Sequence, residues 1–143
     1  MPQMPKTKTW HLPVPDLETS EYWDAAREGR LLIKHCNGCG GDFFYPRTYC
    51  PRCWSADTEW KPSKGRGRVY TFTVVHQNDL PPFNERVPYV VAIVELDEGV
   101  RLTSNIEGVA PDEVRCDMSV HVSFREEQRD DDAVSLPVFV PAE

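Results

Sequence analysis

The sequence predicts a mainly β protein with an N-terminal helical arm, a four-cysteine metal ribbon and a C-terminal five-stranded barrel. Two observations carry this prediction. Four cysteines fall into two close pairs between residues 36 and 53. Beyond residue 68, apolar residues recur with a period of two in short runs separated by turn signals, which is typical of half-buried strands. We therefore expect an arm and helix over 1–33, a ribbon over 34–60 and a barrel over 61–143.

The first of these segments combines an extended stretch with one helix. Residues 1–15 contain four prolines and show no periodicity, so they are expected to be extended. A helix is expected to follow, because Thr19 or Ser20 can cap it and Gly29 can end it. Tyr22 and Trp23 would begin its apolar stripe.

The two cysteine pairs have the spacing C-x2-C-x10-C-x2-C. The residues concerned are Cys36, Cys39, Cys50 and Cys53. Each pair can hold one edge of a tetrahedron around a zinc ion. A site with four cysteine ligands leaves no position for water, so we expect a structural zinc. Iron in a rubredoxin-like site is the alternative, because four thiolates also hold iron.

The remainder of the chain predicts a small barrel after a linker at 60–67. The expected strands are 68–76, 89–96, 100–106, 119–125 and 136–140. Pro137 suggests that the last strand lies at a sheet edge, and the charged stretch 125–132 is expected to be a solvated loop. Five short strands with no second helical segment favour the OB-fold, a five-stranded, partly open barrel.

Charge is distributed unevenly along the chain, whose formal net charge is −7. Residues 27–68 carry nine Lys or Arg against four Asp or Glu, whereas residues 91–143 carry four against thirteen. The basic segment either offsets the thiolate charge of the metal site or forms a phosphate-binding surface with Lys64, Arg66 and Arg68. The acidic remainder argues against a general nucleic-acid binder.

Length and hydropathy limit the class of protein further. At 143 residues the chain is one domain, or one domain with a small module. The longest apolar run, Tyr89 to Val94, has six residues, far fewer than the roughly 20 that span a bilayer. The N-terminus lacks the apolar core of a secretory signal. We therefore expect a cytoplasmic protein with no membrane partner, in which cysteines ligate metal more often than they form disulfides.

A proline-rich loop at 77–88 is the main candidate surface outside the ribbon. It joins the first two barrel strands, a position that OB-folds use for ligands, and loops on rigid scaffolds tend to carry function. The candidate contacts are His76, Asn78, Asp79, Leu80, Phe83 and Arg86. An ordinary hairpin loop is the alternative.

The order of these motifs resembles the family of zinc-ribbon/OB-fold proteins found beside thiolases and thiolase-like, steroid side-chain aldolases. The matching residues beyond the cysteines are Tyr22-Trp23, Pro46-Arg47, Trp60, Gly65-Arg66-Gly67, residues 70–73, Pro88-Tyr89 and residues 96–99. One departure is Cys116-Asp117-Met118, where relatives commonly have a turn that contains glycine.

The resemblance implies an accessory subunit with no catalytic residues of its own. Such a subunit binds a thiolase-superfamily partner in a hetero-oligomer and assists aldol, retro-aldol or acyl-transfer chemistry on acyl-CoA, including steroid side chains. It also implies a CoA thioester as a ligand. The phosphates of CoA need nearby cations, and Lys64, Arg66 and Arg68 are the candidates because arginine binds phosphate bidentately. The alternative is that Gly65-Arg66-Gly67 is a tight turn whose arginine pairs with the acidic barrel.

Two other functions remain open at this point. One is a stand-alone acyl-CoA-binding protein. The other is a single-stranded nucleic-acid-binding module, in which Tyr70 and Phe72 would stack on bases.

Overall fold

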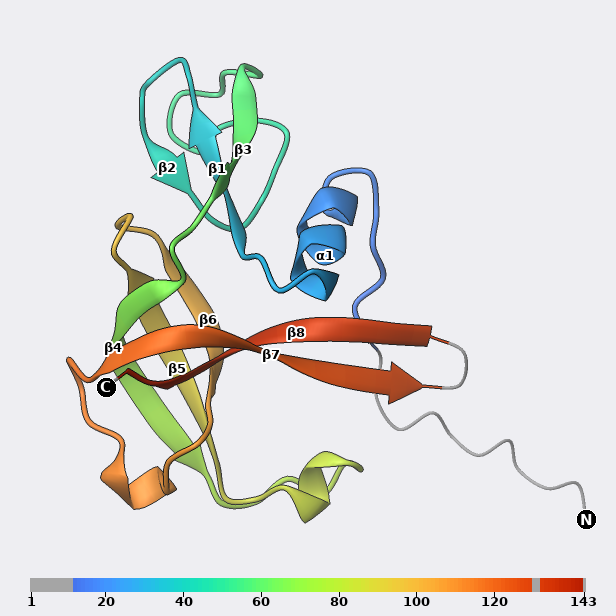
Figure 1. Cartoon of the computed structure of the whole chain (residues 1–143), viewed down its shortest axis with the longest axis vertical. Helices are drawn as coiled ribbons and strands as arrows, with labels where there is room; N and C mark the ends of the chain where they lie inside the picture. Colours follow the sequence, from blue (N-terminus) through green and yellow to red (C-terminus); the bar gives the residue numbers. More distant parts are fainter. Residues whose placement is uncertain (1–11, 130–131, 143) are drawn as a thin grey trace, which may run out of the picture.

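The computed structural model describes residues 12–129 and 132–142. The predicted extended arm before residue 12 lies outside these residues. Figure 1 shows a small sheet at one end of the molecule, a barrel at the other, and one helix beside the junction between them. In the described residues no helix is long and apolar enough to cross a bilayer.

Helix α1 (Ser20–Arg27) forms where the sequence predicts it. Thr19 occupies the N-cap position without a side-chain cap, and the Asp16 carboxylate instead accepts hydrogen bonds from the Glu18 and Thr19 N–H groups. Gly29 has φ of +77°, the left-handed conformation with which many helices end. The helix buries Tyr22, Ala25 and Ala26, so its apolar face packs against the remainder of the protein.

The ribbon is a three-stranded antiparallel sheet in the order β2-β1-β3. Its strands are β1 (Leu32–Cys36), β2 (Asp42–Phe43) and β3 (Thr58–Pro62). The expectation that residues 60–67 form a linker is wrong for 60–62, since these residues pair with β1, and for 66 and 67, which begin strand β4 (Arg66–Val75). The Lys34 ammonium lies 4.7 Å from the ring centroid of Trp60, and this contact helps to hold β3 in the sheet.

The barrel is closed in the order β4-β5-β6-β8-β7, which confirms the predicted five-stranded architecture. Its strands are β4 (Arg66–Val75), β5 (Tyr89–Leu96), β6 (Arg101–Ile106), β7 (Ser119–Arg129) and β8 (Asp132–Pro141). Short 3-10 turns, η1 (Phe83–Glu85) and η2 (Pro111–Glu113), lie in the loops before β5 and β7.

The charged stretch 125–132 is not a loop along its described length. The β7 and β8 pairing continues as far as Arg129 opposite Asp132. Glu127 is buried there, where it pairs with Arg86 and Arg125. These ion pairs explain why charged residues can occupy a strand at this position.

Strand β8 is not a free edge either. It pairs with β7 along its length, and Phe139 also pairs with Ile106 of β6. The Ser104 hydroxyl donates a hydrogen bond to the Pro137 carbonyl. Pro137 therefore lies in a strand that closes the barrel, although its ring nitrogen cannot donate.

The main core joins the helix and the base of the ribbon to the barrel. Tyr22 of α1 and Ile33 of β1 belong to the same buried cluster as the barrel residues Val69, Val94 and Phe139. A second, small cluster in the ribbon contains Cys36, Phe43 and Cys50. The cysteine end of the ribbon (residues 36–58) thus has little apolar core of its own, so its metal ligands are needed to hold it together.

The departure at Cys116-Asp117-Met118 leaves a well-formed turn. Asp117 has φ of +66°, a conformation that aspartate tolerates better than most residues. Its N–H donates to the Val69 carbonyl at 2.7 Å. Aspartate therefore occupies a left-handed position for which glycine is the usual choice.

Candidate metal centre and binding surfaces

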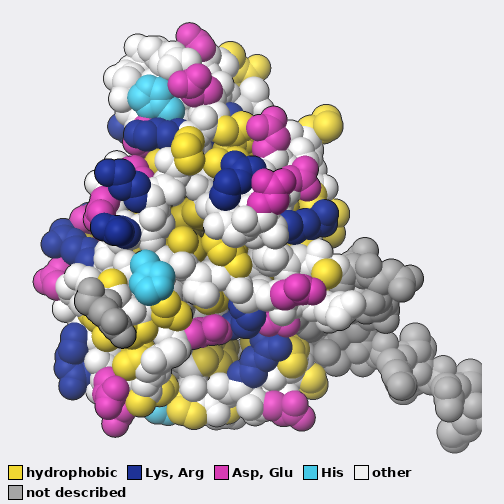
Figure 2. Space-filling view, in the orientation of Figure 1, with side chains coloured by type: hydrophobic (Ala, Val, Ile, Leu, Met, Phe, Trp, Pro, Cys, Tyr) yellow, Lys and Arg dark blue, Asp and Glu magenta, His cyan; other side chains and the backbone are white. Residues whose placement is uncertain are grey.

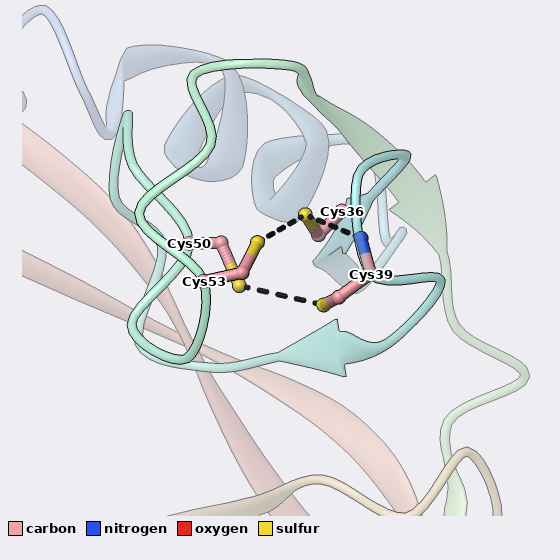
Figure 3. Close-up of side chains that lie close together, drawn as sticks. All are labelled: Cys36, Cys39, Cys50 and Cys53. Atoms are coloured by element: carbon pink, nitrogen blue, oxygen red, sulfur yellow. Dashed lines mark hydrogen bonds between the residues drawn. The ribbon is translucent and has the colours of Figure 1, made fainter.

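The four cysteines converge from two loops of the ribbon (Figure 3). Their ligand atoms all lie within 4.8 Å of one another. The Sγ atoms of Cys36 and Cys53 are 3.5 Å apart, and those of Cys39 and Cys50 are 3.8 Å apart. Four sulfurs at about 2.3 Å from a tetrahedral zinc would lie roughly 3.8 Å apart. The cluster therefore has the size that a zinc ion requires.

The two cysteine pairs form similar turns. In the first, the Gly40 N–H donates to the Cys36 carbonyl; in the second, the Trp54 N–H donates to the Cys50 carbonyl. Gly40 and Trp54 follow the second cysteine of their pairs, and both are left-handed, with φ of +76° and +64°. Glycine adopts this conformation freely, whereas an L-residue with a side chain pays roughly 1–2 kcal/mol. Trp54 is therefore strained, and its side chain is 78% exposed.

Backbone N–H groups prepare the cluster for a cation. Those of Cys53 and Arg52 lower the pKa of Cys50 to about 6. The Cys53 pKa is raised to about 11, because the neighbouring thiols and burial outweigh the lowering by the Ser55 N–H. Zinc is bound by thiolates, so a metal ion displaces the protons that remain on these cysteines when it binds.

Asp42 links the three ribbon strands below the cluster. Its carboxylate lies 2.6 Å from His35 Nδ1 on β1 and 2.6 Å from Lys61 Nζ on β3. Burial alone would raise the Asp42 pKa, but Lys61 and His35 outweigh it and hold that pKa below its usual value of 3.8. The four cysteines form the ligand cluster without His35.

Replacing Asp42 with asparagine should destabilise the ribbon by about 1–3 kcal/mol at pH 7, because hydrogen bonds to a charged carboxylate are lost. Since folding lowers the Asp42 pKa, its stabilisation is complete above the unfolded-state pKa and disappears as pH falls through the folded value. Urea unfolding should therefore show a difference from wild type at pH 7 that narrows below about pH 4. Glu59→Gln, on the exposed face of β3, is the control; an equal loss there would contradict the prediction.

Lys64, Arg66 and Arg68 do not form one cluster. Lys64 and Arg66 line a hollow of about 620 Å³ together with Asp97, Ser119 and His121. Arg68 instead forms ion pairs with Glu95 at 2.9 Å and Asp117 at 3.3 Å. The sequence did not single out His121, which reaches the hollow because it pairs with Arg66 across β4 and β7.

The predicted loop residues are also divided. Phe83 and Arg86 line a hollow of about 520 Å³ that Tyr89 and Arg125 also border. Asn78 donates to the Tyr89 hydroxyl and accepts from the Leu80 N–H. The other predicted contacts, His76, Asp79 and Leu80, are exposed and do not line that hollow. The loop is therefore fixed to the barrel at some positions, and the predicted residues do not form a single site.

An apolar groove of about 460 Å³ lies where the helix, the ribbon and the barrel meet. Tyr22 and Trp23 of α1, Phe44 and Tyr45 of the ribbon, and Leu102 of β6 contribute to its walls. The sequence did not predict this groove, because its lining residues come from three distant segments. An apolar concave surface with a few polar groups is typical of ligand and partner sites.

The features expected of a nucleic-acid binder are weak. The Arg101 guanidinium carbon lies 3.8 Å from the Tyr70 ring centroid, so one face of this proposed stacking residue is covered. Figure 2 shows Lys and Arg side chains interspersed with Asp and Glu on the visible face. Cys116, the fifth cysteine, is exposed and lies outside the metal cluster.

Two family models match adjoining parts of the chain. The rubredoxin-like zinc ribbon domain of ChsH2 matches residues 23–59, and the C-terminal OB-fold domain of ChsH2 matches residues 60–125. These matches confirm the predicted resemblance and the fold class. The four cysteines are accordingly a zinc-binding cluster.

Similar proteins have names that refer to complexes. A probable enoyl-CoA hydratase alpha subunit of Thermomonospora curvata is 38% identical over 91% of this chain and 39% of its own length. The chain thus spans about two fifths of that relative. A DUF35 domain-containing scaffold protein of Methanocaldococcus jannaschii is 39% identical over 77% of this chain and 79% of its own.

Two further similarities cover most of both proteins. The benzoylsuccinyl-CoA thiolase subunit BbsA of Thauera aromatica is 31% identical over 79% of this chain and 78% of its own. A solved structure described as the Ltp2-ChsH2(DUF35) aldolase superposes with a TM-score of 0.77 at 36% identity, covering 91% of this chain and 98% of that chain.

Proposed function

The chain belongs to the ChsH2 family of zinc-ribbon and OB-fold proteins, whose two domain models together match residues 23–125; on that premise we propose that it is an accessory subunit of a thiolase-superfamily enzyme. In this role it would bind the catalytic subunit as a hetero-oligomer and help it to act on acyl-CoA thioesters. The reaction would be an aldol or retro-aldol step or an acyl transfer, and a steroid side chain is one candidate substrate.

The names of the relatives support this choice of partner. BbsA is a subunit of a CoA-thioester thiolase, and the similar solved structure is that of an aldolase with a DUF35 component. Both similarities extend over most of this chain. The proposal takes the nucleophile to be the partner's, since a four-cysteine zinc site is closed to substrate.

Trp54 is the single structural observation that carries the proposal. Its side chain is 78% exposed although its backbone is left-handed, and glycine takes the equivalent position in the first cysteine turn. Strain at an exposed aromatic residue points to a role for the side chain itself. Tyr49, in the same loop, is 56% exposed, and Trp and Tyr are enriched at the centres of protein interfaces. We infer that these two side chains anchor the partner subunit.

Replacing Trp54 with glycine should separate stability from assembly. Relief of the left-handed strain offsets the flexibility of glycine, so the free energy of unfolding should stay within about 1 kcal/mol of wild type. Affinity for the partner should fall at least about 10-fold, because a tryptophan anchor contributes roughly 2 kcal/mol or more. The measurement is calorimetry with a thiolase-superfamily subunit that co-purifies with the tagged full chain from its host and is identified by mass spectrometry.

Leu17→Ala is the matched control for loss of an exposed apolar side chain, because Leu17 is fully exposed and belongs to the segment before α1 rather than to a cysteine loop. It should bind the partner as wild type does. Equal affinity of the wild-type and Trp54→Gly chains would remove the proposed anchor. Turnover of acyl-CoA by the purified chain alone would contradict the accessory role itself.

A further inference from the structure

The apolar groove between α1, the ribbon and the barrel has a row of aromatic side chains along it. The ring centroids of Trp23 and Tyr22 lie 4.9 Å apart, those of Tyr22 and Phe44 lie 5.7 Å apart, and those of Phe44 and Tyr45 lie 4.9 Å apart. Strands β6 and β8 supply more apolar lining, including residues 136–138. Tyr22 is buried whereas Tyr45 is 55% exposed, so the row leads from the core to the surface.

Hydrogen bonds on two sides hold the loop that carries Tyr45. The Thr48 hydroxyl and N–H donate to Glu18 Oε1 at 2.8 Å and 3.2 Å, which joins the loop to the segment before α1. The Thr103 N–H of β6 donates to the Tyr45 hydroxyl at 3.4 Å. The groove is therefore preformed in the free chain, and little ordering entropy is lost when a ligand or partner fills it.

The proposed anchors, Trp54 and Tyr49, are too small to make an interface by themselves. An aromatic side chain buries about 150–250 Å², so the two together bury about 300–500 Å², whereas a stable interface covers roughly 800 Å² on each partner. Tyr49 follows Tyr45 by four residues in one ribbon loop, and residues 45–47 of that loop line the groove. The groove is thus an apolar surface continuous with the anchors, and it can supply the missing area.

The charges of the groove favour an acidic partner segment. Within the described residues, Arg47 and Arg125 line it and no aspartate or glutamate does. Arg125 already pairs with Glu107 and Glu127. Arg47 is exposed, and its charge acts on Glu18 through solvent, an interaction that salt screens. A carboxylate of the partner beside Arg47 would therefore complement the apolar contact.

We propose that the groove is a second contact region for the catalytic subunit, and that it binds an apolar segment of that subunit which carries a carboxylate beside Arg47. The inference rests on the proposed function and deepens it, because it names the chemistry of the surface that the partner presents. At about 460 Å³, the groove has the size of a small-ligand site, so a short run of side chains fills it.

Calorimetry of the zinc-loaded full chain with the co-purified catalytic subunit tests the groove. Tyr45→Ala should weaken binding at least about 10-fold, as loss of an aromatic anchor does. Thr103→Glu should weaken it at least as much, because it leaves an unpaired charge in an apolar contact. Thr103 is exposed on β6, so this variant decides the matter if circular dichroism shows that Tyr45→Ala perturbs the fold.

Leu80→Ala is the matched control, since Leu80 is 62% exposed and lies in the loop before β5, outside the groove. Its affinity for the partner should stay within about 2-fold of wild type, as for most residues outside an interface centre. Wild-type affinity in a folded Tyr45→Ala chain and in Thr103→Glu would overturn the proposal.

The acidic character of the segment has its own test. Arg47→Ala should weaken binding about 2- to 5-fold, as loss of an exposed ion pair does, and should make affinity less sensitive to salt. Salt dependence equal to that of wild type would contradict the carboxylate.

Photo-cross-linking identifies the occupant directly. With p-benzoylphenylalanine in place of Tyr45, the full chain should cross-link to a catalytic-subunit peptide that is apolar and contains aspartate or glutamate. The same group in place of Leu80 should give no such product. Cross-linking to a second copy of this chain, or to a polar, basic segment, would overturn the proposal.

The outcome is separable from that of the accessory role. If the catalytic subunit binds the wild-type chain and the groove variants equally, the groove is wrong and the accessory role stands. If no thiolase-superfamily subunit binds the wild-type chain, the accessory role fails, and the groove proposal fails with it.

Discussion

Replacing Cys36 with serine is expected to abolish zinc binding and unfold the cysteine end of the ribbon (residues 36–58), while β4 to β8 remain paired. The buried cluster at the cysteine end of the ribbon contains Cys36, Phe43 and Cys50. This is too little apolar surface to hold three strands together. In small zinc domains the free energy of metal binding, roughly 10–16 kcal/mol, is also the free energy of folding. Loss of one thiolate ligand should therefore remove most of the free energy that keeps the cysteine end of the ribbon folded.

Two measurements check this expectation. Metal content should fall from one zinc per chain to none, and hydrogen exchange should become fast in β2 and β3 but stay slow in the barrel. Cys116→Ser is the matched control, because this thiol is exposed and outside the cluster. It should keep its zinc and change stability by no more than about 0.5 kcal/mol.

Retention of zinc at wild-type stability in Cys36→Ser would show that the four-cysteine cluster is not the metal centre. The same preparations identify the metal. A colourless wild-type protein is expected for zinc, whereas a red protein would indicate iron in four thiolates.

The second large effect is expected for Phe139→Ala, which should destabilise the barrel by about 3–5 kcal/mol. Phe139 is fully buried in β8 and pairs with both Val122 of β7 and Ile106 of β6. Its carbonyl also accepts a hydrogen bond from the Glu107 N–H at 2.8 Å. Truncation would leave a cavity at the position where the barrel closes.

Urea unfolding, followed by far-ultraviolet circular dichroism, measures this loss. Ile93→Ala, on the outer face of β5 where the side chain is 36% exposed, is the comparison and should cost about 1 kcal/mol or less. Similar values for the two variants would argue against Phe139 as a closing residue. Zinc content should stay at one per chain in both, because neither residue touches the cysteine cluster.

Patterns in the local sequence predicted the metal ligands and several boundaries of helices and strands. The cysteine spacing named the metal ligands, because close pairs in a short loop can reach a common centre without knowledge of the remaining fold. The apolar run at 89–96 predicted β5 to the residue, and Gly29 marked the end of α1. These features depend on neighbours along the chain, so the sequence alone was enough to place them.

Charged segments were harder to assign from sequence. The stretch around Glu127 reads as a solvated loop, yet Glu127 is buried opposite Arg86, a residue 41 positions away. Lys61 was assigned to a linker, yet it pairs with Asp42 across the ribbon, 19 positions away. A charged side chain without a counter-charge stays in solvent, whereas one with a counter-charge can be buried in a strand. The local sequence does not show which of these two cases applies.

The sequence by itself therefore determined the zinc ligands, the strand alternation and the resemblance to a family of thiolase-associated proteins. Only the tertiary structure decided which carboxylate each cation pairs with. Arg66 and Arg68 lie two residues apart in the sequence, but β-sheet register pairs Arg68 with Glu95 and places Arg66 opposite His121 beside a hollow. The reason is that electrostatic partners are chosen by distance through space, and strand register sets that distance.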